Sequence, residues 1–372
     1  MSQSPDQPPL RILHLTAGSD AGGISRYIHD LGVAMVARGH SVAVAGERGA
    51  WHELFANSPL TWIDCPLKGS PLALWRAART LRRWLEAHPV DVLHTHYRRP
   101  TLVARRLQSN RRPPILYTVH LSDLSLRWPR RLLTDFGDHV HVPASEARRW
   151  VVEDAGVPAD RVHLVPHGID PAKFPVVDDA KRRDAREILG LPDDRDGGDA
   201  LVAAYVGRLD YPKNEQWLLD VALRMPRLHL VYAGDGPNEL ALRHRIGELG
   251  LGSRVHLLGH ADPLPAYHAS DALLLPSLRE GFSFACAEAM AAGIPVLRTR
   301  TAGTEELILE GVSGRSVPID RPQFVASAVE FLSDLSALRR MGAAAAQHVR
   351  TKFAFDLQLA RTIDLYRTLS CT

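Results

Sequence analysis

The chain has 372 residues, of which 45% are hydrophobic and 23% charged, and its formal net charge is +3 at pH 7. This length favours two domains, and the composition is ordinary for a globular protein. No run of about 18 apolar residues occurs, so no membrane-spanning helix is expected. The polar residues 1–9 predict a flexible tail without a signal-peptide core. The three cysteines lack CxxC spacing, which predicts neither a disulfide framework nor a zinc site and favours a reducing cytoplasm.

The first half of the chain alternates strand-like and helix-like segments. The run R-I-L-H-L-T (11–16) predicts a buried strand, and a glycine-rich turn leads into a helix over 24–38 that Gly39 ends. A second strand at 41–45 completes a βαβ unit, which implies a parallel sheet that binds ligands at the carboxyl ends of its strands. Further strands are expected at 92–95, 115–119 and 139–142.

Two features of this half could contact a ligand. The pair Gly22-Gly23 is not a G-x-G-x-x-G fingerprint. It either serves turn geometry alone or lets backbone amides at a helix N-terminus approach an anion. His120 follows a strand in Y-T-V-H, at the edge where parallel sheets place their chemistry, although one histidine among 18 is more often structural.

The second half begins after a charged loop that contains one short helix, 179–190. A buried strand from Leu201 leads into G-R-L-D-Y-P-K, where Arg208 and Lys213 flank a strand-to-helix turn. Both are either solvated surface charges or a pair aimed at one ligand. A guanidinium fork and a mobile ammonium would together neutralise a diphosphate leaving group.

The most informative stretch is P-S-L-R-E-G-F-S-F-A-C-A-E-A-M-A-A-G-I-P-V, residues 276–296. An apolar strand at 272–275 precedes it, a helix is expected over 283–292, Gly293 ends that helix, and a strand is expected at 294–297. Glu280 lies at the mouth of the first strand, and Glu288 lies inside an otherwise apolar helix. Glutamate is almost never buried without a partner, so this acidic pair is a candidate site.

Five segments closely resemble motifs of retaining nucleotide-sugar glycosyltransferases of the family 4 type (glycosyl transferases group 1). They are E-G-F-S and E-A-M-A-A-G-I-P-V, which contain the two glutamates, and G-R-L-D-Y-P-K, Y-T-V-H and P-H-G-I-D. The resemblance covers nearly the whole chain, in the expected order. It implies the α/β GT-B fold: two Rossmann-like doubly wound domains facing across a cleft, with a C-terminal helix that crosses back. We expect an acceptor-side domain over 10–175 with helix 354–372, and a donor-binding domain over 176–353.

The resemblance also implies roles for individual residues. Arg208 and Lys213 would stabilise the departing diphosphate, Glu280 would hold the donor sugar, and His120 would bind that sugar or shield the reaction centre. Further donor contacts are implied for Gly22, Gly23, Gly207, Gly259, His260, Gly281, Phe282, Ser283 and Phe284, and for Glu288, whose carboxylate would accept the ribose hydroxyls. No D-x-D cluster that would hold a metal is recognised, so neither a metal nor a cofactor is expected beyond a UDP- or GDP-sugar donor.

The sequence departs from the family pattern at several positions. Leu121 follows His120 where an aspartate is more usual, which leaves the role of Asp123 open. His167 replaces an asparagine in P-H-G-I-D. Ala302 and Glu305 replace the family's glycine and proline, so contacts of that loop with the donor phosphates are not carried over.

An arginine-rich stretch is a second candidate site. Between Pro71 and Arg131 there are 13 arginines and three carboxylates. In residues 74–86, one helical face carries Leu74, Ala77, Ala78, Leu81, Trp84 and Leu85, and the other carries Arg76, Arg79, Arg82 and Arg83. Such a helix either packs on its own sheet with its arginines in water or attracts an anionic membrane surface. Further arginines would extend the surface: Arg98, Arg99, Arg105, Arg106, Arg111 and Arg112.

The expected reaction is transfer of a hexose, with retention, from a nucleoside diphosphate sugar to a saccharide or lipid-linked acceptor, in polysaccharide, glycolipid or glycoconjugate synthesis. We expect a cytoplasmic enzyme, with the inner membrane face as an alternative location. No aromatic stacking motif accompanies the basic stretch, so nucleic acid is not an expected partner. Two alternatives share the architecture: a nucleotide-sugar epimerase and a non-catalytic nucleotide-sugar-binding protein.

Overall fold

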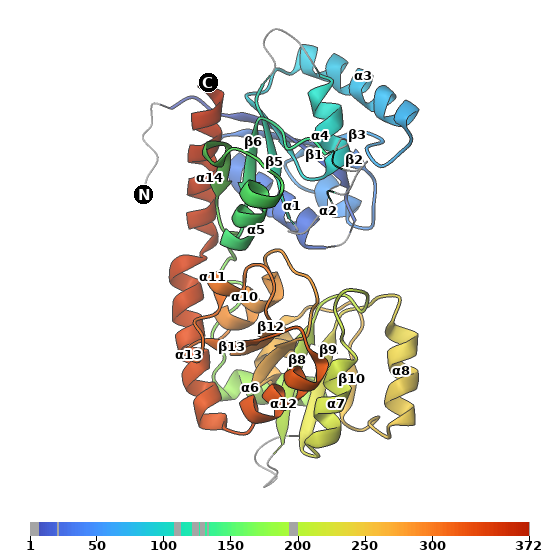
Figure 1. Ribbon diagram of the computed structural model, residues 1–372, viewed down its shortest axis with the longest axis vertical. Helices are drawn as coiled ribbons and strands as arrows, with labels where there is room; N and C mark the ends of the chain where they lie inside the picture. Colours follow the sequence, from blue (N-terminus) through green and yellow to red (C-terminus); the bar gives the residue numbers. More distant parts are fainter. Residues whose placement is uncertain are drawn as a thin grey trace. The chain divides into compact units, whose positions relative to one another are not determined.

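A computed structural model describes residues 7–20, 22–107, 113–120, 126, 131, 134–192 and 200–371. The chain divides into two compact units, each built on one parallel β-sheet (Figure 1). Unit 1 comprises residues 1–166 with 358–372, and unit 2 comprises residues 167–357. This confirms the two Rossmann-like domains expected from the sequence.

Unit 1 is organised around a sheet of seven parallel strands in the order β3-β2-β1-β4-β5-β6-β7. These are β1 (Arg11–Gly18), β2 (Ser41–Glu47), β3 (Thr61–Asp64), β4 (Val92–Thr95), β5 (Ile115–Thr118), β6 (His139–Val142) and β7 (Val162–Leu164). The central strands are buried along their whole length, as parallel strands covered on both faces must be. The order reverses between β1 and β4, and Rossmann-like sheets bind their ligands at such a point.

Helices pack on this sheet, and the longer ones bury several apolar side chains against it. They are α1 (Gly23–Val36), α2 (His52–Ala56), α3 (Pro71–Ala87), α4 (Arg98–Arg105), α5 (Ser145–Arg149) with the π-helical turn Trp150–Asp154, the 3-10 turn Ala159–Arg161, and α14 (Phe355–Ser370). Most of the C-terminal helix α14 belongs to unit 1. There the hydroxyl of Tyr366 forms a hydrogen bond of 2.6 Å with His94 Nδ1.

Unit 2 has six parallel strands in the order β10-β9-β8-β11-β12-β13. They are β8 (Leu201–Val206), β9 (Leu228–Ala233), β10 (Val255–Leu257), β11 (Ala272–Leu275), β12 (Val296–Thr299) and β13 (Gly314–Val317). The helices are α6 (Asp179–Ile188), α7 (Trp217–Arg224), α8 (Glu239–Glu248), α9 (Leu264–Ala269), α10 (Phe284–Ala291), α11 (Thr304–Leu307), α12 (Arg321–Phe331) and α13 (Leu335–Lys352). Here the strand order reverses between β8 and β11, the two strands that precede the cationic and acidic motifs.

Two expected boundaries differ from those of the structure. The division falls after residue 166 rather than 175, because the segment in between packs on unit 2: Phe174 lies in its core, and Ile169 exchanges backbone hydrogen bonds of 2.8 Å with Phe353 and Phe355. The strand expected at 294–297 begins at Val296. Pro295 cannot donate to a sheet, and the amide of Ile294 caps the preceding helix by bonding to Ala289.

Candidate active site

The point in unit 2 where the strand order reverses carries a pair of opposite charges. Lys213 follows β8 and Glu280 follows β11, and the Lys213 ammonium donates to Glu280 Oε1 over 2.8 Å. The side chains of the two residues are 25% and 10% exposed. Ser277 donates a second hydrogen bond to the same oxygen at 2.7 Å. The structure thus brings two residues from separate motifs, 67 positions apart, into one contact.

Glu280 is held in its ionised form. Burial acts to raise its pKa, but the charges of Lys213 and Arg298, with hydrogen bonds from Lys213 and Ser277, outweigh burial and leave the pKa below its usual value. A carboxylate fixed in this way accepts hydrogen bonds and does not donate a proton at neutral pH. It can therefore hold a ligand's hydroxyl groups.

Arg208 is placed differently from Lys213. It is exposed, and its Nε donates to Asp210 Oδ2 at 3.0 Å. An exposed pair of this kind contributes at most about 1 kcal/mol, so an incoming anion can displace it. Arg208 is therefore a mobile cation beside a fixed one.

Close backbone contacts shape the turn that carries these cations. Gly207 has φ of +152°, and a Cβ atom on Gly234 would lie 2.0 Å from the carbonyl oxygen of Gly207. Asn214, with φ of +53°, donates its side-chain amide to the carbonyl of Pro276 at 3.0 Å. This bond ties the loop after β8 to the loop after β11. Gly207, in the turn after β8, and Gly234, in the turn after β9, are therefore required by backbone conformation and close approach.

The helix that follows Glu280 begins as its sequence predicts. Ser283 caps α10, because its hydroxyl oxygen accepts from the amide of Cys286. The preceding Gly281 carbonyl lies beside Gly303, where a Cβ atom would be 2.8 Å away. The amides of the first turn of α10 follow the Glu280 loop closely in sequence. Gly281 adds no side chain between them, so the start of this helix suits an anion.

Glu288 is buried inside its apolar helix, where the sequence predicted it. Its residue is 3% exposed, and one carboxylate oxygen accepts the hydroxyl proton of Tyr267 at 2.9 Å. Gly259 and His260 lie beside the turn after β9, since Gly259 forms a bridge with Gly234 and His260 Nδ1 is 4.0 Å from a carboxylate oxygen of Asp235.

Aromatic rings fill the space next to this loop. The ring of Phe284 lies parallel to that of His167, with planes 15° apart and centroids 5.4 Å apart, and Phe282 meets His167 edge-on at 5.5 Å. The His167 that replaces a family asparagine is thus buried against both phenylalanines expected to contact the donor.

Two features of the described structure were not predicted from the sequence: a buried arginine in unit 2 and a row of histidines in unit 1. Arg298 is 1% exposed and holds the loop after β12 by donating to Thr301 Oγ1 at 2.5 Å and to the carbonyl of Ala302 at 3.3 Å. The sequence feature that could have indicated Arg298 is a single arginine inside an otherwise apolar strand. The other is a row of buried histidines in unit 1, signalled by histidine at alternate strand positions in V-L-H-T-H and H-V-H-V.

In unit 1, the predicted residues follow β1 and β5, the two strands on either side of β4. Gly22 precedes α1 with φ of +149°, and a Cβ atom there would meet nothing within 4 Å. Gly22 and Gly23 are exposed, so their backbone is open to a ligand. His120 follows β5, and its Nε2 lies 3.0 Å from His96 Nδ1. Burial lowers the pKa of His120 to about 3, so its imidazole is neutral. Asp123 lies outside the described residues.

His120 also lines a cavity of about 370 Å³ within unit 1. The cavity walls include His96, Tyr97, Lys68, Arg98 and Arg99. The described residues that line it include three cations and no carboxylate, although Asp20 forms an ion pair with Lys68 at 2.5 Å. This composition suits an anionic, hydroxyl-rich molecule.

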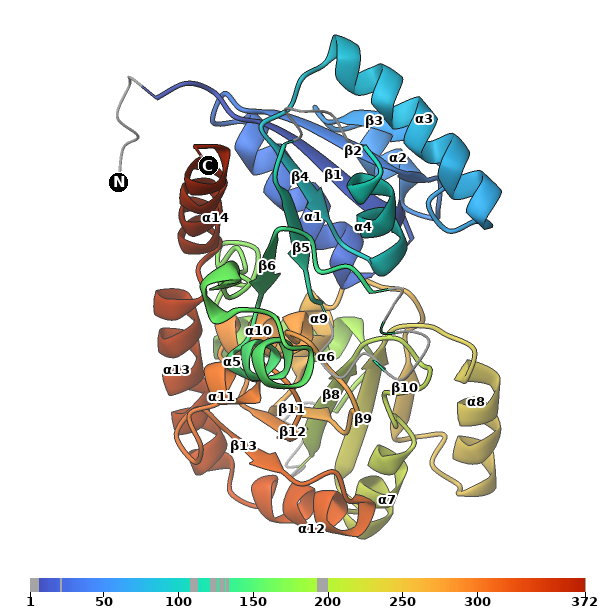
Figure 2. The ribbon, with the colours of Figure 1, turned by 45° about the horizontal axis from the view of Figure 1, so that its top comes forward.

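The basic helix packs on its own sheet, as one of the two interpretations predicted. Leu74, Ala77, Ala78 and Leu81 are buried in the core of unit 1, with Trp84 and Leu85 packed against it. The arginines of α3 face outward, and so do Leu72 and Trp75, at 56% and 55% exposure; Figure 2 shows this helix at the outside of unit 1.

The prediction that six further arginines extend the basic surface of α3 was partly wrong. Arg105 forms ion pairs of 2.7 Å with Asp135 and Asp138, so its charge is compensated. Arg111 and Arg112 lie outside the described residues. None of the helices in the described part of the chain combines the length and apolar character that crossing a bilayer requires.

Comparisons with known proteins agree with this geometry. Residues 21–173 match the family model described as Glycosyltransferase Family 4, and residues 200–334 match Glycosyl transferases group 1. The D-inositol 3-phosphate glycosyltransferase of Corynebacterium glutamicum is 30% identical over 305 residues, covering 74% of this chain and 72% of that protein. Its counterpart from Mycobacterium bovis is 29% identical over 304 residues, covering 74% of this chain and 61% of its own length.

Solved structures show the same fold at low identity. A glycosyltransferase from Rickettsia africae superposes with a TM-score of 0.84 at 17% identity, covering 97% of this chain and 98% of its own. The Anabaena protein HepE in complex with UDP-glucose gives 0.80 at 21% identity, covering 96% of this chain and 100% of its own. The two Rossmann-like units match the GT-B architecture of these structures. The chain belongs to the group 1 glycosyltransferases of the family 4 type.

Proposed function

We propose that this glycosyltransferase moves a hexose from a UDP- or GDP-sugar to an acceptor hydroxyl, with retention of configuration and without a bound metal ion. The observation that carries the proposal is the partly buried Lys213–Glu280 pair at the reversal point of unit 2, with the exposed Arg208 in the same loop as Lys213. HepE, the fold relative solved with UDP-glucose, agrees with a uridine donor.

In this mechanism the cations act on the leaving group. Arg208 would exchange Asp210 for an oxygen of the diphosphate, and Lys213 would donate to another, so that both neutralise charge as the glycosidic bond breaks. The amides at the start of α10 would add further donors. Glu280, ionised and oriented by Ser277, would accept hydroxyl protons of the sugar, and Glu288 would accept from the ribose.

We further propose that the acceptor carries a phosphate or carboxylate and binds in the cavity beside His120. The support is the composition of that cavity, where Lys68, Arg98 and Arg99 supply positive charge and Tyr97 a hydroxyl. The relatives named for D-inositol 3-phosphate carry a phosphorylated cyclitol in their name, which matches this chemistry.

A third part of the proposal concerns location. Leu72 and Trp75 are exposed among the arginines of α3, and the Arg79 guanidinium lies 5.9 Å from the centre of the Trp75 ring. Exposed apolar rings flanked by cations suit the interface of an anionic membrane, so the enzyme would act at the inner membrane face.

A thermal-shift panel with UDP, GDP, ADP and their common sugars tests the donor site. A ligand at about 100 times its Kd stabilises a fold by roughly 2.7 kcal/mol. We expect one base to stabilise the wild type and the Lys173→Ala control, whose lysine is exposed in the same unit, but not Lys213→Ala.

The products decide the reaction class. Release of free nucleoside diphosphate that depends on an acceptor supports transfer. A changed sugar still attached to its nucleotide would mean epimerisation, and no response to any nucleotide would refute the donor site.

A further inference from the structure

Arg298 is a buried cation whose side chain contacts no carboxylate among the described residues. It belongs to β12 and is 1% exposed. Its Nη2 donates to Thr301 Oγ1 and to the carbonyl of Ala302, and its Nε donates to the carbonyl of Thr299 at 3.3 Å. In the described part of the chain, its Nη1 is buried without a hydrogen-bond partner. The hydrogen-bond partners of this cation are therefore neutral oxygens.

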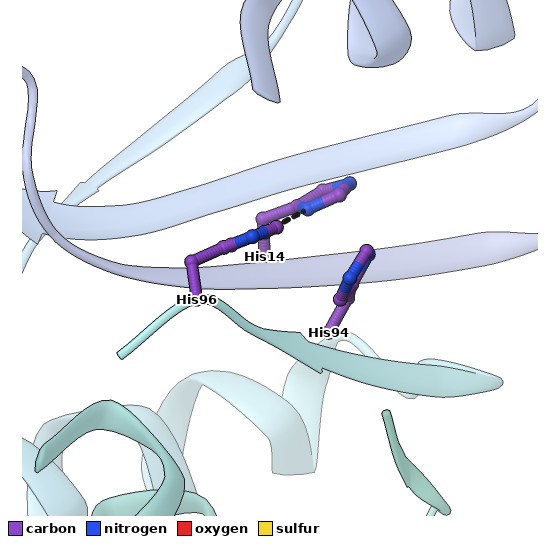
Figure 3. A group of neighbouring side chains, drawn as sticks. All are labelled: His14, His94 and His96. Atoms are coloured by element: carbon purple, nitrogen blue, oxygen red, sulfur yellow. Dashed lines mark hydrogen bonds between the residues drawn. The ribbon is translucent and has the colours of Figure 1, made fainter. Parts of the chain in front are cut away.

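Arginine keeps its charge when it is buried, unlike the histidines of unit 1. Figure 3 shows His14, His94 and His96, with the rings of His14 and His96 joined by a hydrogen bond. Burial lowers the pKa of His14 and His96, so these two rings are neutral at pH 7. A guanidinium, with a pKa above about 12, stays protonated in a protein. Because neutral oxygens offset its burial only in part, a function explains Arg298 better than stability does.

The guanidinium of Arg298 lies at the carboxyl end of β12, since its partners Thr301 and Ala302 follow that strand. β12 pairs in parallel with β11, and Arg298 stands opposite Leu275, the last residue of β11. This is the edge of the sheet where the loop after β11 begins. The cation therefore lies beside the loop that carries the candidate active site.

Two further contacts join the end of β12 to that loop. The hydroxyl of Thr299 donates to the carbonyl of Ser277, whose own hydroxyl donates to Glu280 Oε1 at 2.7 Å. A Cβ atom on Gly303 would lie 2.8 Å from the carbonyl oxygen of Gly281. The segment that follows Arg298 thus packs against the residues on both sides of Glu280.

The charge of Arg298 acts on the site. Burial acts to raise the pKa of Glu280, and the charges of Lys213 and then Arg298 are the leading causes that lower it. Arg298 also acts to lower the pKa of the Cys286 thiol in α10, although burial raises that pKa overall. Lys213 and Glu280 neutralise each other across 2.8 Å. Arg298 therefore adds one positive charge to a pair that is neutral by itself.

We propose that Arg298 is a positioning residue of the donor site: from β12, its buried charge gives the Lys213–Glu280 pair a surplus of one positive charge, which the donor diphosphate balances. Arg298 acts through the electrostatic potential at the pair rather than through a contact with the nucleotide. The inference rests on the proposed function in taking this pair as the place where the diphosphate binds.

The test is calorimetric binding of UDP and GDP at low, constant ionic strength, because salt screens such charges. Arg298→Met removes the charge and should raise the Kd of the nucleotide that binds the wild type about tenfold. Arg298→Lys keeps the charge and should bind within about threefold of the wild type. The control Arg315→Met, in the neighbouring strand β13, removes an arginine that is paired with Glu330 and should bind like the wild type.

A charge cycle separates the surplus charge from general damage to the site. Glu280→Gln removes the carboxylate and raises the surplus to two, so it should lower the Kd of the same nucleotide about tenfold, even though kcat falls. The double variant Glu280→Gln with Arg298→Met returns the surplus to one and should bind within about threefold of the wild type. General damage would instead weaken binding in every variant.

Unfolding in urea is measured on the same variants. Arg298→Met should be at least as stable as the wild type, because an apolar side chain replaces a buried charge. An unchanged Kd in Arg298→Met, or an equal rise in Arg298→Met and Arg298→Lys, would overturn the inference. If Arg298→Met does not fold, Arg298→Gln removes the charge and keeps an amide donor in its place.

Failure of the proposed function gives a different result. If neither UDP nor GDP binds the wild type, the donor site is refuted and the inference with it. A near-normal kcat in Glu280→Gln, together with the expected order of Kd values, would refute the role of Glu280 in the reaction and still support the role of Arg298.

Discussion

Lowering the pH from 7.5 to 5.5 should weaken unit 1, because three of its histidines are neutral in the folded core. His14, His96 and His141 are at most 2% exposed, and burial holds the pKa of each below the usual 6.5. In the unfolded chain the same rings bind protons as the pH falls below 6.5. The unfolded state therefore binds more protons in this window, so stability is greatest above pH 6.5 and is lost as the pH falls.

The magnitude follows from proton linkage. Each histidine that stays neutral when folded costs about 1.4 kcal/mol of stability between pH 7.5 and 5.5, which gives about 4 kcal/mol for the three. A typical domain has only about 5–15 kcal/mol in total. The result requires only that the three folded pKa values lie below 5.5.

The assay is urea unfolding followed by tryptophan fluorescence at both pH values. Six of the seven tryptophans precede residue 167, so the signal reports mainly on unit 1. The variant His14→Leu should show a pH dependence smaller by about 1.4 kcal/mol, and His88→Gln, at an exposed position, should match the wild type. Equal unfolding free energies at pH 7.5 and 5.5 in the wild type would refute the reasoning.

Three further predictions test the site and the surfaces around it. Glu280→Gln keeps the shape of the side chain but removes the charge that Lys213 faces, so kcat should fall about 100-fold while the fold persists. The control Glu239→Gln, on α8, should have no effect on kcat. A near-normal kcat in Glu280→Gln would contradict the assignment. Lys68→Ala and Arg99→Ala should each raise the KM for a phosphorylated acceptor about tenfold and leave the KM for the donor unchanged; an equal effect on a neutral acceptor would argue against an anion site. Trp75→Ser should reduce co-sedimentation with vesicles of anionic lipid, while Leu240→Ser, which removes an exposed apolar side chain in unit 2, should not; binding that ignores lipid charge would count against the membrane surface.

Local chemistry was sufficient to predict most elements. The strands predicted at 92–95, 139–142 and 272–275 match β4, β6 and β11, although β4 and β6 carry buried histidines among their apolar residues. Gly293, with φ of +83°, ends the helix where the sequence predicted, since few other residues adopt that conformation. Motif order along the chain predicted the family and the two-sheet fold.

Pairings over long sequence distances could not be predicted in the same way. The motifs named Lys213 and Glu280 separately, but only the crossover that places β8 beside β11 brings them within 2.8 Å. Glu288 is buried with Tyr267 as its hydrogen-bond partner, and the charge of Arg105 is compensated by two aspartates 30 and 33 positions further along. Whether a residue is buried or paired with an opposite charge depends on which residues lie near it in the folded chain.

The histidines show the division between sequence and structure. The sequence carries His94 and His96 two residues apart, and likewise His139 and His141, which puts each pair on one face of its own strand. Only the tertiary structure set β1 against β4 and β4 against β5, which turned separate imidazoles into a chain of hydrogen bonds ending at His120. Side-chain period is fixed by the backbone of one strand, whereas the identity of the neighbouring strand is decided by how the whole core packs.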